Sequence, residues 1–336
     1  MSMNPFQSAS NRIIVLALVA LMILPFTTGG WGFYGHRKIN RLAVFTLPDG
    51  IFPFYRSHLE FITEHAIDPD KRRYSVIGEA EKHYIDIDHY CKDKSCDPFE
   101  EVPQSWSDAV EKFSEDTLRA YGIVPWNIQW TLRKLSDAFR EKNQAQILRL
   151  SAEIGHYVAD ACVPLHTTEN YNGQLTNQKG IHAFWESRLP ELFDEEYDLF
   201  TGKAAYLDKS WEDVWGTVKE SHFAVDSVLS FEAQLNTEFA EDKKYVFEER
   251  GASIMKNYSR EYSRTYHEML NGMVERRMKK AIFLIGSLWY TAWIDAGQPD
   301  LSPLENESFP EDILEELSRE SNLPEKENLK SRSHDN

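Results

Sequence analysis

The strongest constraint in the sequence is the segment 153–166, which contains two histidines and an aspartate close together. Apolar residues enter and cross it at steps of three and four, at Ile147, Leu150, Ile154 and Val158. This periodicity predicts a helix on which His156 and Asp160 lie one turn apart on the same face and can bind one ion. Pro164 cannot continue the helix, so we expect an irregular segment just beyond the helix end to present His166.

A second pair of the same kind begins sixteen residues after His166. His182 and Glu186 again place an imidazole and a carboxylate at positions i and i+4. One such pair is more often an ordinary pair on a helix surface. Two pairs together with His166, within about thirty residues, favour a site for a divalent ion such as zinc, because solvated faces rarely collect histidine so densely.

The composition limits the classes of partner. The 336 residues are 42% hydrophobic and 13% aromatic, which suffices for the core of one large domain or two small ones. Lysine and arginine number 37 against 54 acidic residues, which gives a formal net charge of −17. This charge argues against avid binding to a polyanion, whose affinity comes mainly from Lys and Arg meeting phosphates.

Residues 1–30 are typical of a secretory signal peptide. Arg12 is their only charged residue, an apolar run covers residues 13–26, and small residues precede Trp31. The alternative is an uncleaved membrane anchor, but the run is shorter than the roughly twenty apolar residues that a spanning helix needs. We therefore expect cleavage before Trp31 and a secreted or periplasmic protein.

The three cysteines are expected to differ in role. Cys91 and Cys96 lie close together in a polar stretch and could form a disulfide in an oxidising compartment. Cys162 lies on the predicted metal-binding helix and is expected to be a small buried side chain.

The rest of the chain is predicted to be mostly helical. Helical spacing of apolar residues recurs before Pro48, over 56–67, around 132–139, around 215–225 and over 262–296. Residues 83–90 alternate like a strand, but they lack an obvious partner and we interpret them as an extended loop. From Glu305 onward, ten acids, four bases and two prolines predict a solvated, partly disordered tail.

Nine potential metal ligands occur in an order that matches a known superfamily: Trp31, His36, Asp68, His83, His156, Asp160, His166, His182 and Glu186. With this set the chain resembles the secreted zinc-dependent phospholipases C and the fungal single-strand nucleases, over about 260 residues up to Gly297. The resemblance implies an all-α protein whose single multi-helix domain, residues 31–300, holds three Zn²⁺ ions in a cleft. Residues 301–336 would form the acidic tail.

The same resemblance assigns the ligands of each ion. The first zinc would be bound by Asp68, His83, His156 and Asp160, and the second by His166, His182 and Glu186. The third would be bound by the α-amino group and carbonyl oxygen of Trp31, by His36, and by Asp160 as a bridge. This role of Trp31 requires cleavage, because a peptide nitrogen cannot donate to zinc as a free α-amine does.

The activity implied is hydrolysis of a phosphodiester, with a zinc-bound hydroxide attacking phosphorus in line with the leaving oxygen. Asp68 is a candidate general base beside that water, although it could equally be only a structural ligand. Tyr84 and Asp86 are candidate substrate contacts, with loop capping as the alternative for Asp86. His65 and His89 are either hydrogen-bond partners of the ligands or plain surface histidines.

The residues divide between the two branches of the superfamily. The gap from His166 to His182 and the choice of Glu186 resemble the phospholipases, and the acidic charge also favours phospholipid over single-stranded nucleic acid. The spacing of Asp68, fifteen residues before His83, together with the interval of only five residues from Trp31 to His36, is more like the nucleases. We expect a phosphodiester substrate, transient contact with a membrane surface and no stable protein partner. A non-catalytic metal-binding protein and a membrane-anchored interaction protein are the alternatives from other classes.

Overall fold

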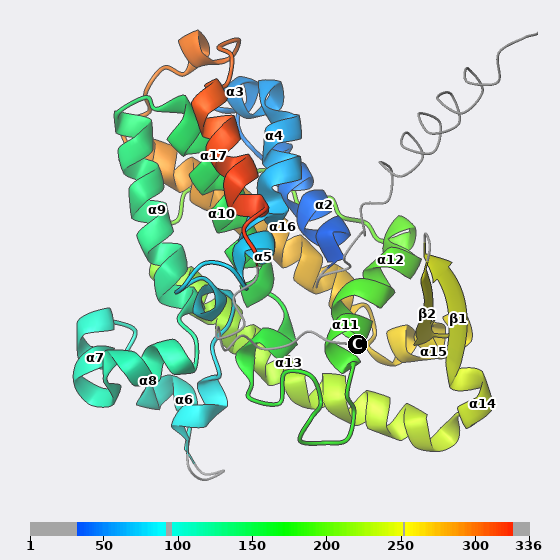
Figure 1. Ribbon diagram of the computed structural model, residues 1–336. Helices are drawn as coiled ribbons and strands as arrows, with labels where there is room; N and C mark the ends of the chain where they lie inside the picture. Colours follow the sequence, from blue (N-terminus) through cyan, green and yellow to red (C-terminus); the bar gives the residue numbers. More distant parts are fainter. Residues whose placement is uncertain (1–31, 92–95, 251–252, 325–336) are drawn as a thin grey trace, which may run out of the picture.

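The computed structural model describes residues 32–91, 96–250 and 253–324, and the fold is built almost entirely from helices (Figure 1). The long helices are α2 (Gly32–Val44), α9 (Val124–Arg140), α10 (Gln144–Ala161), α13 (Ser210–Glu238) and α16 (Met273–Asp295). The shorter ones are α3 (Phe52–Ser57), α4 (Leu59–Glu64), α5 (Asp68–Arg72), α6 (Pro98–Glu101), α7 (Trp106–Phe113), α8 (Glu115–Ala120), α11 (Ile181–Ala183), α12 (Leu189–Phe193), α14 (Glu241–Lys244), α15 (Arg260–Met269) and α17 (Glu311–Ser321). The predicted all-α class is confirmed, apart from one small hairpin.

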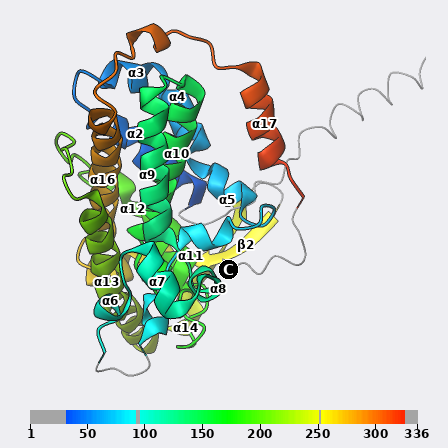
Figure 2. The same ribbon diagram turned by 90° about the vertical axis from the view of Figure 1, so that its left-hand side faces the viewer.

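Helix α10 lies at the centre of the molecule and packs against α9, α16 and α2. The side chain of Asn143 caps its first turn by accepting a hydrogen bond from the backbone N–H of Gln146 at 3.1 Å. Of the four residues that carry the predicted periodicity, Ile147, Ile154 and Val158 are fully buried, whereas Leu150 is only partly buried. Figure 2 shows α9 and α10 running alongside each other. The predicted metal-binding helix is therefore also the core helix.

Helix α2 approaches α10 closely because Gly155 has no side chain. A Cβ atom at Gly155 would lie 2.1 Å from Oδ1 of Asn40 on α2. Asn40 is completely buried, and its Nδ2 donates a hydrogen bond to the carbonyl of Ala152 at 3.1 Å. This approach brings the ring of His36 onto that of His156, with centroids 3.9 Å apart.

Two predicted elements differ from the structure. The single helix predicted over 262–296 is divided into α15 and α16, because Asn271 and Gly272 both have positive φ, of 48° and 73°. Residues 83–90 are not one extended loop: 3₁₀ turns cover Ala80–His83 and Ile87–Tyr90, and only the residues between them are extended.

The hairpin was not predicted from the sequence. Strands β1 (Tyr245–Arg250) and β2 (Ser253–Tyr258) pair antiparallel, with Tyr245 opposite Tyr258. Glu248 accepts hydrogen bonds from the guanidinium of Arg188, at 2.9 and 2.6 Å. This ion pair ties the hairpin to the π-helical turn Phe184–Arg188, which also carries Glu186.

The C-terminal segment corrects the expectation of a solvated tail over 301–336. Within it, α17 is a folded helix that packs against α5, and Leu317 is only 3% exposed. The predicted signal peptide, residues 1–30, lies outside the described residues. None of the helices in the described ranges is both long and apolar enough to cross a membrane.

The close approach of α2 and α10 can be tested with Gly155→Ala. We expect the added methyl group to lower the free energy of unfolding by about 1–3 kcal/mol, because Asn40 has no room to move. Gly216→Ala in α13 is the matched control: its Cβ would meet nothing within 4 Å, so it should raise stability by about 0.5–1 kcal/mol. Equal denaturation midpoints for Gly155→Ala and wild type would contradict this packing.

Candidate metal centre

The centre is organised around the carboxylate of Asp160, which is 1% exposed. Its Oδ2 lies 2.9 Å from Nδ1 of His83 and 3.3 Å from Nε2 of His156. Its Oδ1 lies 3.4 Å from Nε2 of His36. Helix α10 supplies His156 and Asp160, α2 supplies His36, and the 3₁₀ turn Ala80–His83 supplies His83. One carboxylate thus connects donors from three parts of the chain.

A second buried group is formed by His166, His182 and Glu186, whose ligand atoms lie within 4.8 Å of one another. Nε2 of His166 is 3.4 Å from Oε2 of Glu186, and His182 contacts the same oxygen. Glu186 also falls within 4.8 Å of His36 and Asp160, so the two groups are contiguous. The predicted spacing of His182 and Glu186 does bring them together, although a π-helical turn carries Glu186.

Backbone carbonyls fix the orientation of three of these histidines. Nδ1 of His156 is 2.8 Å from the carbonyl of Ala66, and Nδ1 of His166 is 2.6 Å from that of His83. Nδ1 of His182 is likewise 3.0 Å from the carbonyl of Tyr171. Donation from Nδ1–H leaves Nε2 as the basic nitrogen, and Nε2 is the atom that each ring turns toward the carboxylates.

The carboxylates are ionised despite their burial. Burial alone would raise the pKa of Asp160, but His156 and His166 outweigh it and hold that pKa well below its usual range. The neighbouring His182 and His166 likewise lower the pKa of Glu186 against the effect of burial. Burial lowers the pKa of His83 to about 4, so its ring is neutral. Ionised carboxylates beside a neutral imidazole form a set of donors for a cation.

Comparison with known proteins agrees with this arrangement. A family model described as zinc dependent phospholipase C matches residues 35–249, which is more than half of the 336-residue chain. The chain belongs to this family. Among solved structures it is similar to alpha-toxin from an avian strain (SWCP) of Clostridium perfringens, at 12% identity and a TM-score of 0.45. That match covers 81% of this chain and 65% of the toxin chain. No curated protein matches the sequence.

The donors present fit the zinc that the phospholipase C family uses. They are imidazole nitrogens and carboxylate oxygens, which are common zinc ligands. Nδ1 of His36, Nε2 of His83 and Oδ2 of Asp70 are buried and have no hydrogen-bond partner among the described residues. Buried polar atoms normally have a partner, so unpaired nitrogen and oxygen atoms of this kind, beside ionised carboxylates, are consistent with ligands of a metal ion.

Two carboxylates of α5, those of Asp68 and Asp70, face different neighbours. Asp68, proposed as a zinc ligand and general base, accepts hydrogen bonds from Nδ1 of His65 at 2.5 Å and Nζ of Lys71 at 2.9 Å. The carboxylate that faces the cluster is that of Asp70, whose Oδ1 is 3.7 Å from Nε2 of His156 and 3.8 Å from Nδ1 of His83. The contacts of Asp68 support neither role, and the sequence analysis missed Asp70.

Arg73 was also missed. It is 3% exposed, and its Nη1 lies 3.9 Å from Oδ1 of Asp70. Its Nε and Nη2 have no hydrogen-bond partner among the described residues. A buried guanidinium with unpaired donors is costly unless it meets an anion. The run Asp-Pro-Asp followed by Lys-Arg-Arg could have indicated a charged functional turn, but not which of its members face inward.

The remaining candidates have these positions. Tyr84 and Asp86 are buried, and the hydroxyl of Tyr84 donates to the carbonyl of Ala120 at 3.4 Å. Their role as substrate contacts stays a prediction. His65 bonds to Asp68, and His89 bonds to Glu169 at 3.1 Å. Among the described residues, these partners are not members of the histidine cluster. Trp31 lies outside the described residues.

Two substitutions on α5 distinguish the acidic ligands. Asp70→Asn should weaken zinc binding by at least about tenfold, because it removes the negative charge that faces His83 and His156. Asp68→Asn is the matched control and should change zinc affinity much less. Competition with a chromophoric chelator measures both. A larger loss in Asp68→Asn would restore the ligand set predicted from the sequence.

Proposed function

We propose that the protein is a zinc-dependent phosphodiester hydrolase of the phospholipase C type. The observation that carries this proposal is the contiguity of the two buried groups, which Asp160 and Glu186 join through His36. Adjacent metal sites with a shared carboxylate suit in-line displacement at phosphorus, where charge develops on both the attacking and the leaving oxygen. Membership of the family supports the same chemistry.

The proposed number of zinc ions is three. His83, His156 and Asp160 would hold one together with Asp70 from α5, and His166, His182 and Glu186 would hold a second. The third would be held by His36 and Asp160 with the α-amino group and carbonyl oxygen of Trp31 after cleavage. The backbone N–H of Gly32 donates to Oγ of Ser187 at 3.0 Å, next to Glu186 in the sequence. This contact places Gly32, the first residue of α2, beside the turn that carries Glu186.

The chain's own residues would act as follows in the reaction. Bound zinc would lower the pKa of a water molecule and neutralise phosphoryl oxygens. Arg73 would donate to the non-bridging oxygens of the phosphodiester, because a guanidinium matches the geometry of a phosphate. Asp160 and Glu186 stay ionised and hold the metal in place. The carbonyls of Ala66, His83 and Tyr171 keep each imidazole aligned, so that no reorganisation is needed as charge develops.

Phospholipid is the favoured substrate, and single-stranded nucleic acid is the alternative. The resemblance to the nucleases rested on the fifteen residues from Asp68 to His83 and on the five residues from Trp31 to His36. If Asp70 is the ligand, the first spacing becomes thirteen residues, and only the second still favours the nucleases. The net charge of −17 continues to disfavour a polyanion.

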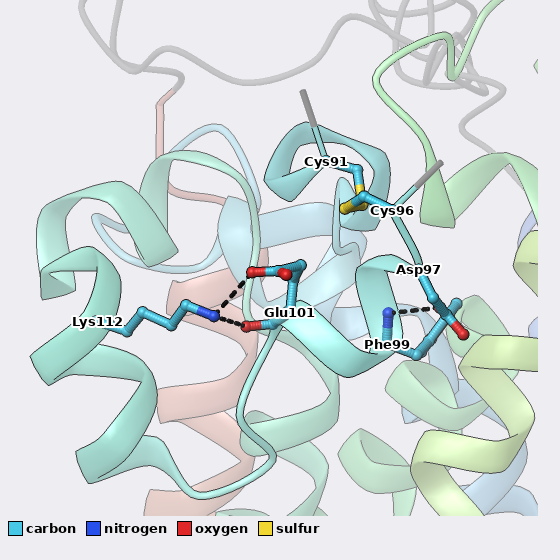
Figure 3. Close-up of a disulfide and its surroundings, with 6 residues drawn as sticks. All are labelled: Cys91, Cys96, Asp97, Phe99, Glu101 and Lys112. Carbon is cyan, nitrogen blue, oxygen red and sulfur yellow. Dashed lines mark hydrogen bonds and ion pairs between the residues drawn. A yellow bond between two sulfur atoms is a disulfide. The ribbon is translucent and has the colours of Figure 1, made fainter. Parts of the chain in front are cut away.

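Export from the cytoplasm is part of the proposal. Besides the N-terminal sequence, it is supported by the disulfide between Cys91 and Cys96, since structural disulfides persist mainly in oxidising compartments. Figure 3 shows this disulfide just before Asp97, which caps α6 by accepting from the backbone N–H of Phe99 at 2.9 Å. The third cysteine, Cys162, is buried and unpaired, as predicted.

The mature protein, beginning at Trp31 and loaded with zinc, should release phosphorylated head group from phosphatidylcholine faster than it releases nucleotides from single-stranded DNA. Both assays are run at matched zinc and several salt concentrations, with bound zinc measured by elemental analysis. Efficient DNA cleavage without phospholipid turnover would make the nuclease alternative correct. Fewer than two zinc equivalents with full activity would contradict the metal mechanism.

Arg73→Lys tests the phosphate-binding role. It keeps the positive charge but loses the planar pair of donors, so we expect kcat to fall by about 10²–10³ while zinc stoichiometry stays unchanged. Arg264→Lys is a control on the surface, where Arg264 pairs with Glu196, and it should retain wild-type kcat. An Arg73→Lys enzyme with wild-type kcat would remove Arg73 from the mechanism.

A further inference from the structure

The C-terminal helix α17 is fastened to the body of the protein at several points. In Figures 1 and 2 it lies beside α5, on the far side of that helix from α11. Before α17, the ring of Phe309 stacks on Phe61 with centroids 4.5 Å apart. After it, Oγ of Ser75 donates to the carbonyl of Leu323 at 3.0 Å. The contact with Ser75 lies only a few residues beyond Asp70 and Arg73 in the chain.

Glu320 joins α17 to two buried or half-buried arginines. Its carboxylate accepts from Nη2 of Arg149 on α10, at 3.0 and 2.9 Å. Its Oε2 also lies 3.9 Å from Nη1 of Arg72, the last residue of α5. Glu316, one turn earlier on α17, bonds to Arg149 at 3.1 Å. Among the described residues, it makes no ion pair with Arg72. The two acids of α17 therefore differ in one respect, the contact with α5.

Arg72 is the centre of a network of ion pairs next to the histidine cluster. It is 5% exposed, and it pairs with Glu79 at 3.0 Å and with Glu153 at 2.9 Å, besides Glu320. Glu79 in turn lies 3.8 Å from Nε2 of His83, one of the predicted zinc ligands. Arg72 thus stands between the C-terminal helix and the histidine cluster.

Glu320 helps to neutralise two arginines that share another carboxylate. Arg149 and Arg72 both pair with Glu153, at 3.2 and 2.9 Å. Without Glu320, Arg149 would depend more on Glu153 and would compete for it with Arg72. A buried arginine that loses a carboxylate partner becomes an uncompensated buried charge, which destabilises its position. Because α5 has only five residues, its own hydrogen bonds cannot hold its orientation against such a change.

We propose that α17 is a positioning element for the metal centre, and that the contact of Glu320 with Arg72 holds α5 so that Asp70 and Arg73 face the ligand histidines. The inference rests on the proposed function, because it takes the cluster to be a zinc site. Glu320 and Arg72 touch neither substrate nor metal in this scheme. They act through Asp70.

The test compares Glu320→Gln with Glu316→Gln in the full mature chain. Both variants remove one charge from α17 and weaken its bond to Arg149, but only Glu320→Gln removes the contact with Arg72. We expect Glu320→Gln to weaken the binding of one zinc equivalent by about tenfold, and Glu316→Gln to leave it within about twofold of wild type. Competition with a chromophoric chelator measures affinity. The visible absorption of the Co²⁺-substituted protein should shift in Glu320→Gln only.

A second variant separates position from charge. Leu317→Ser removes the buried contact of α17 without changing any charge, and it should weaken the same zinc equivalent. Unchanged zinc affinity in both Glu320→Gln and Leu317→Ser would overturn the inference. So would equal losses in Glu320→Gln and Glu316→Gln, since these would indicate a general effect of charge. If the wild-type chain bound no zinc, the proposed function itself would fail, which is a different result.

Discussion

The structure depends on one buried carboxylate, that of Asp160. Its position is set by α10, one helical turn after His156, and its two oxygens meet different histidines. A buried anion must be compensated by positive or hydrogen-bonding groups. This requirement brings His36 from α2 and His83 from a 3₁₀ turn to the same place, and the absence of a side chain at Gly155 allows α2 to come close enough. The core packing and the metal centre are therefore set by the same few contacts.

The histidines are held largely by the backbone. Three of them meet backbone carbonyl oxygens: those of Ala66 and His83 lie 90 and 83 residues away in the sequence, and that of Tyr171 lies 11 residues away. A backbone carbonyl is present whatever side chain its residue carries, so the alignment of the rings follows from the fold and not from residue identity at those three positions. A site prepared in this way is oriented before an ion arrives, and metal binding then adds to the folding free energy.

The sequence could predict the parts of the centre that depend on local geometry. His156 with Asp160 and His182 with Glu186 are one helical turn apart, so periodicity alone brings each pair together. The sequence could not decide between Asp68 and Asp70, which lie on either side of Pro69. Which of them faces the histidines depends on the orientation of α5, and Arg72 sets that orientation through its pairs with Glu79 and Glu153. Resemblance selected Asp68, whereas tertiary contacts turn Asp70 inward.

The tail was mispredicted for a related reason. Its ten acids against four bases suggest a solvated segment when the tail is counted alone. Their partners are Arg149 and Arg72, about 170 and 250 residues earlier in the chain, which composition within a window cannot reveal. Part of the net charge of −17 is therefore compensated locally, at ion pairs that hold α17 to the body.

The net charge that remains bears on the class of substrate. An acidic chain repels a polyanion over a Debye length of about 8 Å at physiological salt, whatever the cleft contains. Arg73 and bound zinc would place positive charge only inside the centre, where one phosphodiester reaches it. A zwitterionic phospholipid brings that single phosphodiester with no net charge to be repelled, whereas a nucleic acid brings its whole backbone. The same centre can therefore favour lipid without any contact that recognises lipid as such.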